Sequence, residues 1–163
     1  MSYYLLGFVI AIIISTAWML YPRNQIRFLE NVYPGKLGLY IRALETDEEV
    51  AHRADEFWSL ASAVKLPVAI EVLRQIDKKE HLLDGLIEVR EVDYVDGPGT
   101  TNLKPVGTAL TIRELLESSL IESDNTAHDI LLRVAGLDRV NQMLHQFGPR
   151  GFSNIVSAKD LRR

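Results

Sequence analysis

The pattern of hydrophobic and polar positions is most regular between Ala61 and Asp77, where apolar side chains recur at helical spacing. These positions are Leu66, Ala69, Ile70, Leu73 and Ile76. Residues three or four apart lie on one face of a helix, so the pattern predicts a buried amphipathic helix with these side chains in the core. Pro67 lies in the first turn and lacks an N–H, so we expect the start of this helix to be tight or irregular.

Upstream of this helix, the pattern predicts a short amphipathic helix over residues 24–32 and then two strands. The strands cover Lys36–Leu44 and Glu48–Ala54 and form a hairpin around the turn Glu45-Thr46-Asp47. Apolar and other side chains alternate along the first strand, as in a strand with one buried face. We therefore expect one face of this hairpin to contribute to a core.

Downstream, residues 82–106 are predicted to be extended and rich in turns, with the strongest turn signal at Asp96-Gly97-Pro98-Gly99. Thr111 and Glu114 fit a capping box that opens a buried helix ending near Glu122, with its apolar stripe at Leu115, Leu116, Leu120 and Ile121. Two further helices are predicted over Thr126–Ala135 and Asp138–Phe147, each closed by a glycine.

The N-terminal run from Tyr3 to Tyr21 carries no charge. As a helix it spans about 28 Å, close to the thickness of a hydrocarbon core, so an uncleaved membrane anchor is preferred to a cleaved signal peptide or a buried core helix. Arg23 and Arg27 follow the run and no Lys or Arg precedes it. By the positive-inside rule this charge pattern places the following domain in the cytoplasm.

The composition, with 47% hydrophobic and 25% charged residues in a chain of 163, indicates one globular domain over residues 23–163 after an anchor over residues 1–22. A net charge of −4 without a Lys/Arg run argues against nucleic acid as a partner. The chain has no cysteine, which excludes disulfides and thiolate zinc sites. Its four histidines are scattered, so no metal site is predicted.

Two short motifs carry candidate chemistry. Ser62 and Lys65 are three residues apart, which places a hydroxyl and an amine on one face at the start of a helix, where N–H groups are unpaired. A partly desolvated Lys65 can take the proton of Ser62. Ser123-Asp124-Asn125 follows much later in the chain, between two predicted helices. The alternatives are a chance S-x-x-K with a surface lysine, and a plain helix cap at S-D-N.

The motifs A-S-A-V-K-L-P-V-A and L-T-I-R-E-L-L-E-S-S-L-I-E-S-D-N-T-A-H-D-I-L-L occur in this order, the second over Leu110–Leu132. Through them, the chain resembles the class A β-lactamase family of penicillin-recognising serine hydrolases over most of Leu37–Gly148. This resemblance implies an α+β fold of the serine β-lactamase-like (transpeptidase-like) type, here present in part, with a strand pair leading into a mostly helical region.

The resemblance also implies roles for the motif residues. Ser62 is the expected nucleophile, Lys65 the base, Ser123 the hydroxyl that relays a proton to the leaving nitrogen, and Asn125 an amide that orients the substrate. Asp124 is expected to be structural. The implied substrate is a β-lactam, no cofactor is implied, and the implied location is extracytoplasmic, periplasmic or on the outer face, against the charge rule above. The alternatives are a D-alanyl-D-alanine peptidase and a non-catalytic, membrane-tethered β-lactam-binding module.

The sequence also departs from the family pattern. It contains no K-T-G or K-S-G and no glutamate after Glu122, and it stops at Arg163, soon after the S-D-N motif. In the family, a glutamate activates the deacylating water and the K-T-G strand forms one wall of the cleft. We therefore expect the N-terminal part of a longer protein, with a C-terminal fragment as a possible partner and negligible turnover by this chain alone.

Overall fold

The computed structural model describes residues 22–147. Among these residues, no helix is long and apolar enough to cross a membrane. The membrane helix predicted over residues 3–21 lies outside the described range.

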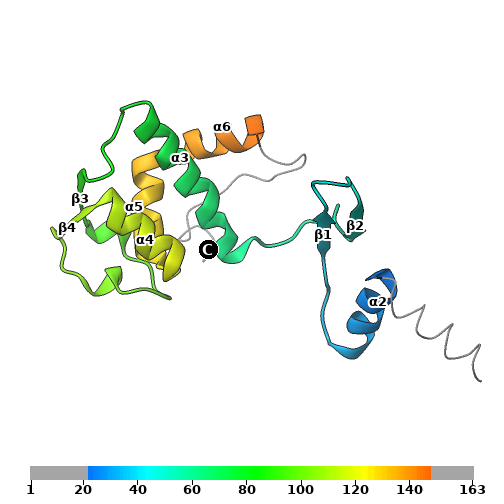
Figure 1. Ribbon diagram of the computed structural model, residues 1–163. Coiled ribbons are helices and arrows are strands. Elements are labelled where there is room, and N and C mark those ends of the chain that lie inside the picture. The colour runs from blue at the N-terminus through cyan, green and yellow to red at the C-terminus, as the bar shows by residue number, and fades with distance from the viewer. Residues whose placement is uncertain (1–21, 148–163) are drawn as a thin grey trace, which may run out of the picture. The chain divides into compact units, whose positions relative to one another are not determined.

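The described chain forms two compact units, one up to Ser59 and one from Leu60 onward (Figure 1). The N-terminal unit contains α2 (Pro22–Val32), β1 (Leu39–Arg42) and β2 (Glu49–His52). The helical unit begins with the 3-10 helix η1 (Ala61–Val64), and its other elements are α3 (Lys65–Asp77), β3 (Leu86–Glu88), η2 (Glu91–Asp93), η3 (Thr101–Leu103), β4 (Ala109–Thr111), α4 (Ile112–Ile121), α5 (Asn125–Ala135) and α6 (Leu137–Phe147).

The N-terminal unit contains the predicted helix and hairpin. β1 and β2 pair antiparallel with Leu39 opposite His52 and Arg42 opposite Glu49, so the hairpin has the expected order but shorter strands. The expectation of a buried strand face is wrong, because Ile41 is 54% exposed and no residue of β1 is fully buried. Within the N-terminal unit, α2 packs on β2, and β1 is left largely exposed.

The helical unit holds a continuous apolar core, to which α3, α4, α5 and α6 all contribute. α5 lies against each of the other three helices and is buried along almost its whole length. The most completely buried large side chains of this core include Ile112, Leu115, Ile130 and Leu131. This core fixes the positions of the helix ends that carry the two motifs.

A second strand pair, β3 with β4, lies at the edge of the helical unit (Figure 1). Leu86 pairs with Thr111 and Glu88 with Ala109. The sequence pattern indicated only extended, turn-rich chain over residues 82–106, because such short strands do not show a clear period of two. The pairing leads directly into α4 through Thr111.

Local helix signals predicted the ends of α4 and α5 well. Thr111 Oγ1 accepts the N–H of Glu114 at 3.1 Å while Glu114 Oε2 accepts the N–H of Thr111 at 2.7 Å, which is the predicted capping box. Gly136 ends α5 with a φ of 83°, a conformation that favours glycine. The α4 stripe is only partly buried, since Leu120 and Ile121 are 47% and 81% exposed.

The buried face of α3 agrees only in part with the one that the apolar spacing predicted: Ala69 is buried and Ile76 packs against the core, as expected. Val68 and Val72 are completely buried and Ala69 nearly so, whereas Leu66, Ile70 and Leu73 are exposed. The buried face also includes Lys65, Glu71 and Gln75. Gln75 Nε2 donates to Glu71 Oε1 at 3.0 Å and to the carbonyl of Ala135 at 2.8 Å, so hydrogen bonds compensate its burial. Because the inner face also carries these polar side chains, the hydropathy pattern favoured the outer apolar side chains instead.

Candidate active site

The first motif lies where the chain enters α3. Ala61 has a φ of 44°, which is uncommon for a residue with a side chain, and the chain then turns through the 3-10 helix η1 before α3 begins at Lys65. Ser62 is exposed within η1, while Lys65 is 5% exposed. The expected irregular start of the helix is therefore present. As a result the hydroxyl of Ser62 is accessible to solvent, whereas the amine of Lys65, one turn later, is buried.

The second motif forms the corner between α4 and α5. Ser123 has a φ of 58°, and Asp124 is the N-cap of α5, where its Oδ1 accepts the N–H of Ala127 at 2.8 Å. Asp124 Oδ2 accepts two further N–H groups, from Thr100 and Thr101, each at 2.8 Å. Asp124 thus holds the corner and the 100–101 segment together, as expected of a structural residue.

Packing of α3 against α5 brings the polar groups of the two motifs together. Ser123 Oγ lies 2.9 Å from Ser62 Oγ and accepts from Lys65 Nζ at 2.8 Å. Lys65 Nζ also donates to Asn125 Oδ1 at 2.9 Å and to the carbonyl oxygen of Ser123. The Ser123 hydroxyl is therefore the link between Ser62 and Lys65, which the sequence analysis had joined directly.

Burial, nearby charges and hydrogen bonds shift the pKa values of Lys65 and Asp124. Burial lowers the pKa of the Lys65 ammonium, although the negative charge of Asp124 acts in the opposite direction. Burial also acts to raise the pKa of Asp124, but the N–H donors of Ala127, Thr101 and Thr100 together hold it below its ordinary value. Lys65 is thus more readily deprotonated than a surface lysine, which suits it to proton transfer.

His128 lies one turn beyond Asn125 in α5 and is buried, with an exposed fraction of 3%. Burial, and then the charge of Lys65, lower its pKa to about 4. Its Nδ1 is buried and has no hydrogen-bond partner. His128 is therefore neutral at pH 7.

The loop Asp96-Gly97-Pro98-Gly99 supports the S-D-N corner, a role that the sequence analysis did not assign. Asn125 Nδ2 donates to the carbonyl of Asp96 at 3.2 Å, and the backbone N–H of Asn125 donates to the carbonyl of Pro98 at 3.1 Å. A Cβ on Gly97 would collide with Asn125 Nδ2, and one on Gly99 would collide with the Asp124 carboxylate. The sequence signal that could have indicated this supporting role is the pair Gly97 and Gly99, both of which have a positive φ.

No group of three or more His, Cys, Asp or Glu side chains within residues 22–147 is arranged to hold a metal ion. The polar groups assembled here are two hydroxyls, an amine and an amide. Such a set can deprotonate a serine and orient a carbonyl substrate.

A family model for the beta-lactamase enzyme family matches residues 22–161 of this sequence. The chain belongs to this beta-lactamase family. It is 33% identical over 121 residues to the beta-lactamase ROB-1 of Haemophilus influenzae, a match that covers 74% of this chain. Among solved structures, it is similar to a beta-lactamase from Sphaerobacter thermophilus, with 33% identity, a TM-score of 0.72 and 78% of this chain covered. An ancestral class A beta-lactamase gives 30% identity, a TM-score of 0.76 and 84% coverage of this chain.

These matches confirm the predicted membership of the class A beta-lactamase family and the serine beta-lactamase-like α+β fold. The chain spans 39% of the Haemophilus relative, 48% of the Sphaerobacter chain and 53% of the ancestral one. The beta-lactamase matches therefore apply to about half or less of each relative.

Proposed function

We propose that this chain carries the acylating part of a serine beta-lactamase, in which Ser62 attacks the carbonyl carbon of a β-lactam ring. The observation that supports the proposal best is the chain of polar contacts from Ser62 Oγ through Ser123 Oγ to Lys65 Nζ, at 2.9 and 2.8 Å. A nucleophile and a base within hydrogen-bond reach of a shared group are what covalent catalysis by serine requires.

In the proposed step, Lys65 in its neutral form draws a proton from Ser123, and Ser123 takes the proton of Ser62 as the Ser62 oxygen bonds to the carbonyl carbon. The C–N bond of the ring then breaks. The proton returns from Lys65 through Ser123 to the ring nitrogen, so Lys65 ends neutral and the opened β-lactam is an ester of Ser62. The proton taken from the nucleophile is the one given to the leaving nitrogen.

Two other features have positioning and stabilising roles in this proposal. Asn125 is held by Asp96, Pro98 and Lys65, which leaves its amide fixed beside the reacting centre, where it can orient a substrate carbonyl or amide. The first turn of α3 begins next to Ser62, and the free N–H groups and dipole at a helix start favour negative charge on the attacked oxygen.

The test is to incubate the whole chain with penicillin G and measure its intact mass. An ester of the opened ring retains every atom of the β-lactam, so the expected increase is one penicillin molecule. Ser62→Ala should abolish the adduct, and Lys65→Ala should slow its formation by about 10²–10⁴-fold because the general base is lost. Ser118→Ala is the matched control, since Ser118 lies on α4 and its hydroxyl takes no part in the contacts among the four polar groups. It should label like the parent.

Other outcomes would contradict this assignment. Labelling that survives Ser62→Ala places the reaction elsewhere. Absence of any adduct, with cleavage of a D-alanyl-D-alanine peptide that Ser62→Ala abolishes, would support the peptidase alternative. Absence of both reactions would support a non-catalytic module.

We further propose that release of the adduct by residues 1–163 is very slow. These residues contain no K-T-G and no glutamate after Glu122 that could activate a deacylating water. A general base contributes about 10²–10⁴-fold, so its loss leaves an ester that persists. The expected result is no steady hydrolysis of a chromogenic β-lactam. Multiple turnover that Lys65→Ala abolishes would contradict this proposal, and the buried Asp129 would then be the first candidate base to test.

For location, we propose that residues 3–21 anchor the chain in a membrane with the domain on the extracytoplasmic side. The uncharged run supports the anchor, and a β-lactam substrate supports the side. Because the chain has no cysteine, a Leu103→Cys variant gives a single thiol at a position that is 78% exposed. It should react with a membrane-impermeant maleimide in intact cells, whereas reaction only after lysis would place the domain in the cytoplasm.

A further inference from the structure

Thr126 follows Asn125 directly in α5, and its side chain is buried, with an exposed fraction of 1%. Its hydroxyl makes two hydrogen bonds to one residue of the segment before η3. Oγ1 accepts the N–H of Val95 at 3.0 Å and donates to the carbonyl of Val95 at 3.1 Å. A hydroxyl has one proton to donate and two lone pairs, so it can pair with both backbone groups at once. Thr126 therefore fixes the backbone of Val95, which is itself buried.

The residue after Val95 carries the group that orients the Asn125 amide. The Asp96 carbonyl accepts from Asn125 Nδ2 at 3.2 Å, and at the other end of the same amide Asn125 Oδ1 accepts from Lys65 Nζ at 2.9 Å. A carbonyl oxygen can only accept, so it faces the amino end of the amide and directs the amide oxygen toward Lys65. Rotating the amide by half a turn would place its N–H groups against the Lys65 amine, which is also a donor. The Asp96 carbonyl therefore determines which end of Asn125 faces Lys65.

Val95 and Asp96 are joined by a rigid link. The Val95 carbonyl that Thr126 holds belongs to the planar peptide unit that ends at the Cα of Asp96. Only the two backbone torsions of Asp96 separate this Cα from the Asp96 carbonyl oxygen. The segment is held again just beyond this carbonyl, because the Pro98 carbonyl accepts the backbone N–H of Asn125 at 3.1 Å. Fixing Val95 therefore restricts where the Asp96 carbonyl can lie.

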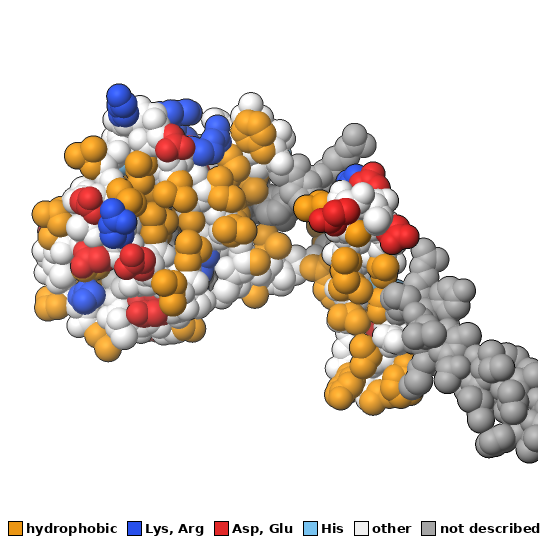
Figure 2. Space-filling view, in the orientation of Figure 1, with side chains coloured by type: hydrophobic (Ala, Val, Ile, Leu, Met, Phe, Trp, Pro, Cys, Tyr) orange, Lys and Arg blue, Asp and Glu red, His pale blue; other side chains and the backbone are white. Residues whose placement is uncertain are grey.

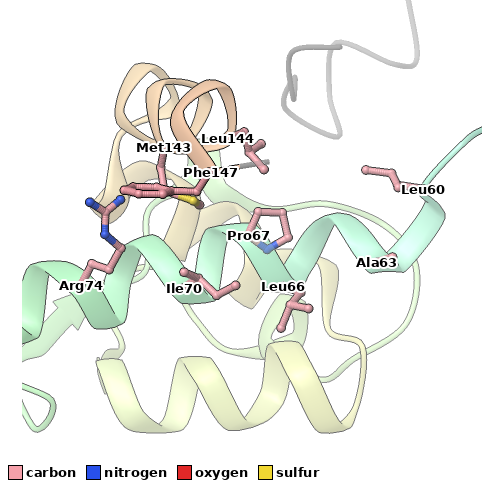
Figure 3. A pocket seen from close by; sticks show the side chains of 9 residues that line it. All are labelled: Leu60, Ala63, Leu66, Pro67, Ile70, Arg74, Met143, Leu144 and Phe147. Atoms are coloured by element: carbon pink, nitrogen blue, oxygen red, sulfur yellow. The ribbon is translucent and has the colours of Figure 1, made fainter. Parts of the chain in front are cut away.

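The apolar hollow beside α3 does not support the Asn125 amide. Figure 3 shows this hollow between α3 and α6, with Leu144 of α6 among the side chains that line it. All the described side chains that line it are apolar except Arg74, and none of the four polar groups of the candidate site is among them. Figure 2 shows hydrophobic side chains gathered over α3 in the same unit. Because apolar side chains cannot hydrogen-bond to an amide, the segment 95–98 is the support that matters for Asn125.

We propose that Thr126 is a positioning residue for acylation, which holds the Asn125 amide in its working orientation through the backbone of residues 95 and 96. This proposal rests on the proposed function, in which Asn125 orients the β-lactam. The Thr126 hydroxyl is engaged with Val95, so it acts on the reaction only through Asn125. A small displacement of an orienting group slows a reaction even when the group is chemically unchanged. Loss of the Thr126 hydroxyl should therefore slow acylation although every group of the site remains.

The first test compares two substitutions of Thr126 in the full chain. Thr126→Val keeps the branched shape but removes the hydroxyl, whereas Thr126→Ser keeps the hydroxyl. The measured quantity is the rate of adduct formation with saturating penicillin G, followed by intact mass. Thr126→Val should slow the reaction by about 10–10²-fold, as expected of a misplaced orienting group, and Thr126→Ser should restore most of the parent rate. Equal rates in the parent and Thr126→Val would overturn the proposal, as would a Thr126→Ser variant as slow as Thr126→Val.

A double-mutant cycle with Asn125→Ala separates positioning from a general loss of structure. In the Asn125→Ala background there is no amide to orient, so Thr126→Val should slow the reaction no further. The melting temperature should fall in both backgrounds, because Val95 loses two hydrogen bonds. If Thr126→Val instead slows the reaction by the same factor with and without Asn125, Thr126 acts only on the stability of the fold and the proposal is overturned.

Gly97 provides an independent variant, which also decides the matter if Thr126→Val does not fold. A Cβ on Gly97 would collide with Asn125 Nδ2, so Gly97→Ala displaces the amide while the Thr126 hydroxyl stays in place. It should slow adduct formation in the parent and have no further effect in the Asn125→Ala background, where the colliding amide is gone. Gly107→Ala is the matched control and should label like the parent. Gly107 also has a positive φ, of 88°, but a Cβ there would meet nothing closer than 3.7 Å. Equal labelling of the two glycine variants would overturn the proposal.

A measurement that needs no reaction distinguishes failure of this proposal from failure of the proposed function. The nuclear magnetic resonance signal of the Asn125 side-chain amide, in an isotope-labelled Ser62→Ala chain, is assigned by its absence after Asn125→Ala. Thr126→Val should shift this signal, and Thr126→Ser should leave it near its original position. If the parent forms no adduct while the signal behaves in this way, acylation is refuted and the positioning of Asn125 by Thr126 is supported. A signal that Thr126→Val leaves unchanged overturns the positioning role, whatever the rate of acylation.

Discussion

Within the described residues, every fully buried apolar side chain except Ile26 belongs to the helical unit. The N-terminal unit has apolar residues as well, but Tyr40, Leu44 and Phe57 are all more than half exposed. The helical unit is therefore stabilised by its own core, which is also what positions Ser62, Lys65 and Ser123. The N-terminal unit relies on strand pairing and exposed polar contacts, which contribute much less than apolar burial.

The two units can be followed separately in the intact chain. Trp58 is the only tryptophan among residues 22–147, and it lies in the N-terminal unit. The sequence has one other tryptophan, Trp18, so a Trp18→Phe background makes fluorescence report on Trp58 alone. Most of the described helix lies in the helical unit, so circular dichroism reports mainly on that region. Denaturation followed by both signals tests whether the two units differ in stability, as their burial predicts.

The largest effect is expected for a cavity in the helical core. Leu115 is completely buried, so Leu115→Ala should lower the free energy of unfolding by about 2–5 kcal/mol. The matched change in the N-terminal unit, Leu44→Ala at a position 86% exposed, should cost less than about 0.5 kcal/mol. Urea denaturation followed by circular dichroism and by Trp58 fluorescence measures both, and equal losses would show that the burial difference does not control stability.

The next effect is acid sensitivity of the helical unit through His128. Its folded pKa of about 4 lies below the ordinary value of 6.5, so the unfolded chain binds more protons between these pH values. Stability conferred by the neutral ring is fully present above pH 6.5 and is lost as the pH falls toward 4. The loss should reach up to about 3 kcal/mol.

The variant His128→Met isolates this contribution, because methionine fills a similar space without titrating. The stability difference between parent and variant should shift in favour of the variant as the pH falls from 6.5 to 4. The measurement is urea denaturation by circular dichroism at several pH values. A pH dependence identical in both proteins would show that His128 is protonated in the folded chain as easily as in the unfolded one.

A smaller effect is expected at the ion pair between Arg133 and Asp93. Arg133 donates from Nε and Nη2 to the two carboxylate oxygens, both at 2.8 Å, and Asp93 is 2% exposed. Arg133→Ala leaves that carboxylate buried and poorly satisfied, so we expect a loss of about 2 kcal/mol. Thermal denaturation by circular dichroism measures it. A loss below about 0.5 kcal/mol would indicate that water replaces the guanidinium without cost.

The smallest effect is expected for the equivalent pair in the N-terminal unit. Arg42 Nη2 lies 2.6 Å from Asp47 Oδ1, but both side chains are about half exposed or more. Solvent screens such a pair, so Arg42→Ala should give no resolvable change in the denaturation curve of Trp58. A clear shift of this curve that disappears in high salt would show that the ion pair contributes to the stability of the hairpin despite its exposure.

Several elements were predictable because their signals are local. The capping box at Thr111 and Glu114, the glycine that closes α5 and the hairpin around residues 45–47 each depend on residues close in sequence. The strands β3 and β4 were not predictable, since each of these short strands gains its stability from a partner that is distant in the sequence. The same holds for the 96–99 loop, whose role depends on its contact with Asn125.

The sequence by itself determined the candidate site residues: Ser62, Lys65, Ser123 and Asn125 stand out as motifs with a defined order and separation. Only the tertiary structure decided that Ser123 joins Ser62 to Lys65, that His128 is buried, and that α3 turns Leu66, Ile70 and Leu73 outward. The physical reason is that hydropathy records which side chains can be buried. Which face of a helix is covered depends on the neighbours that pack against it, and these come from distant parts of the chain.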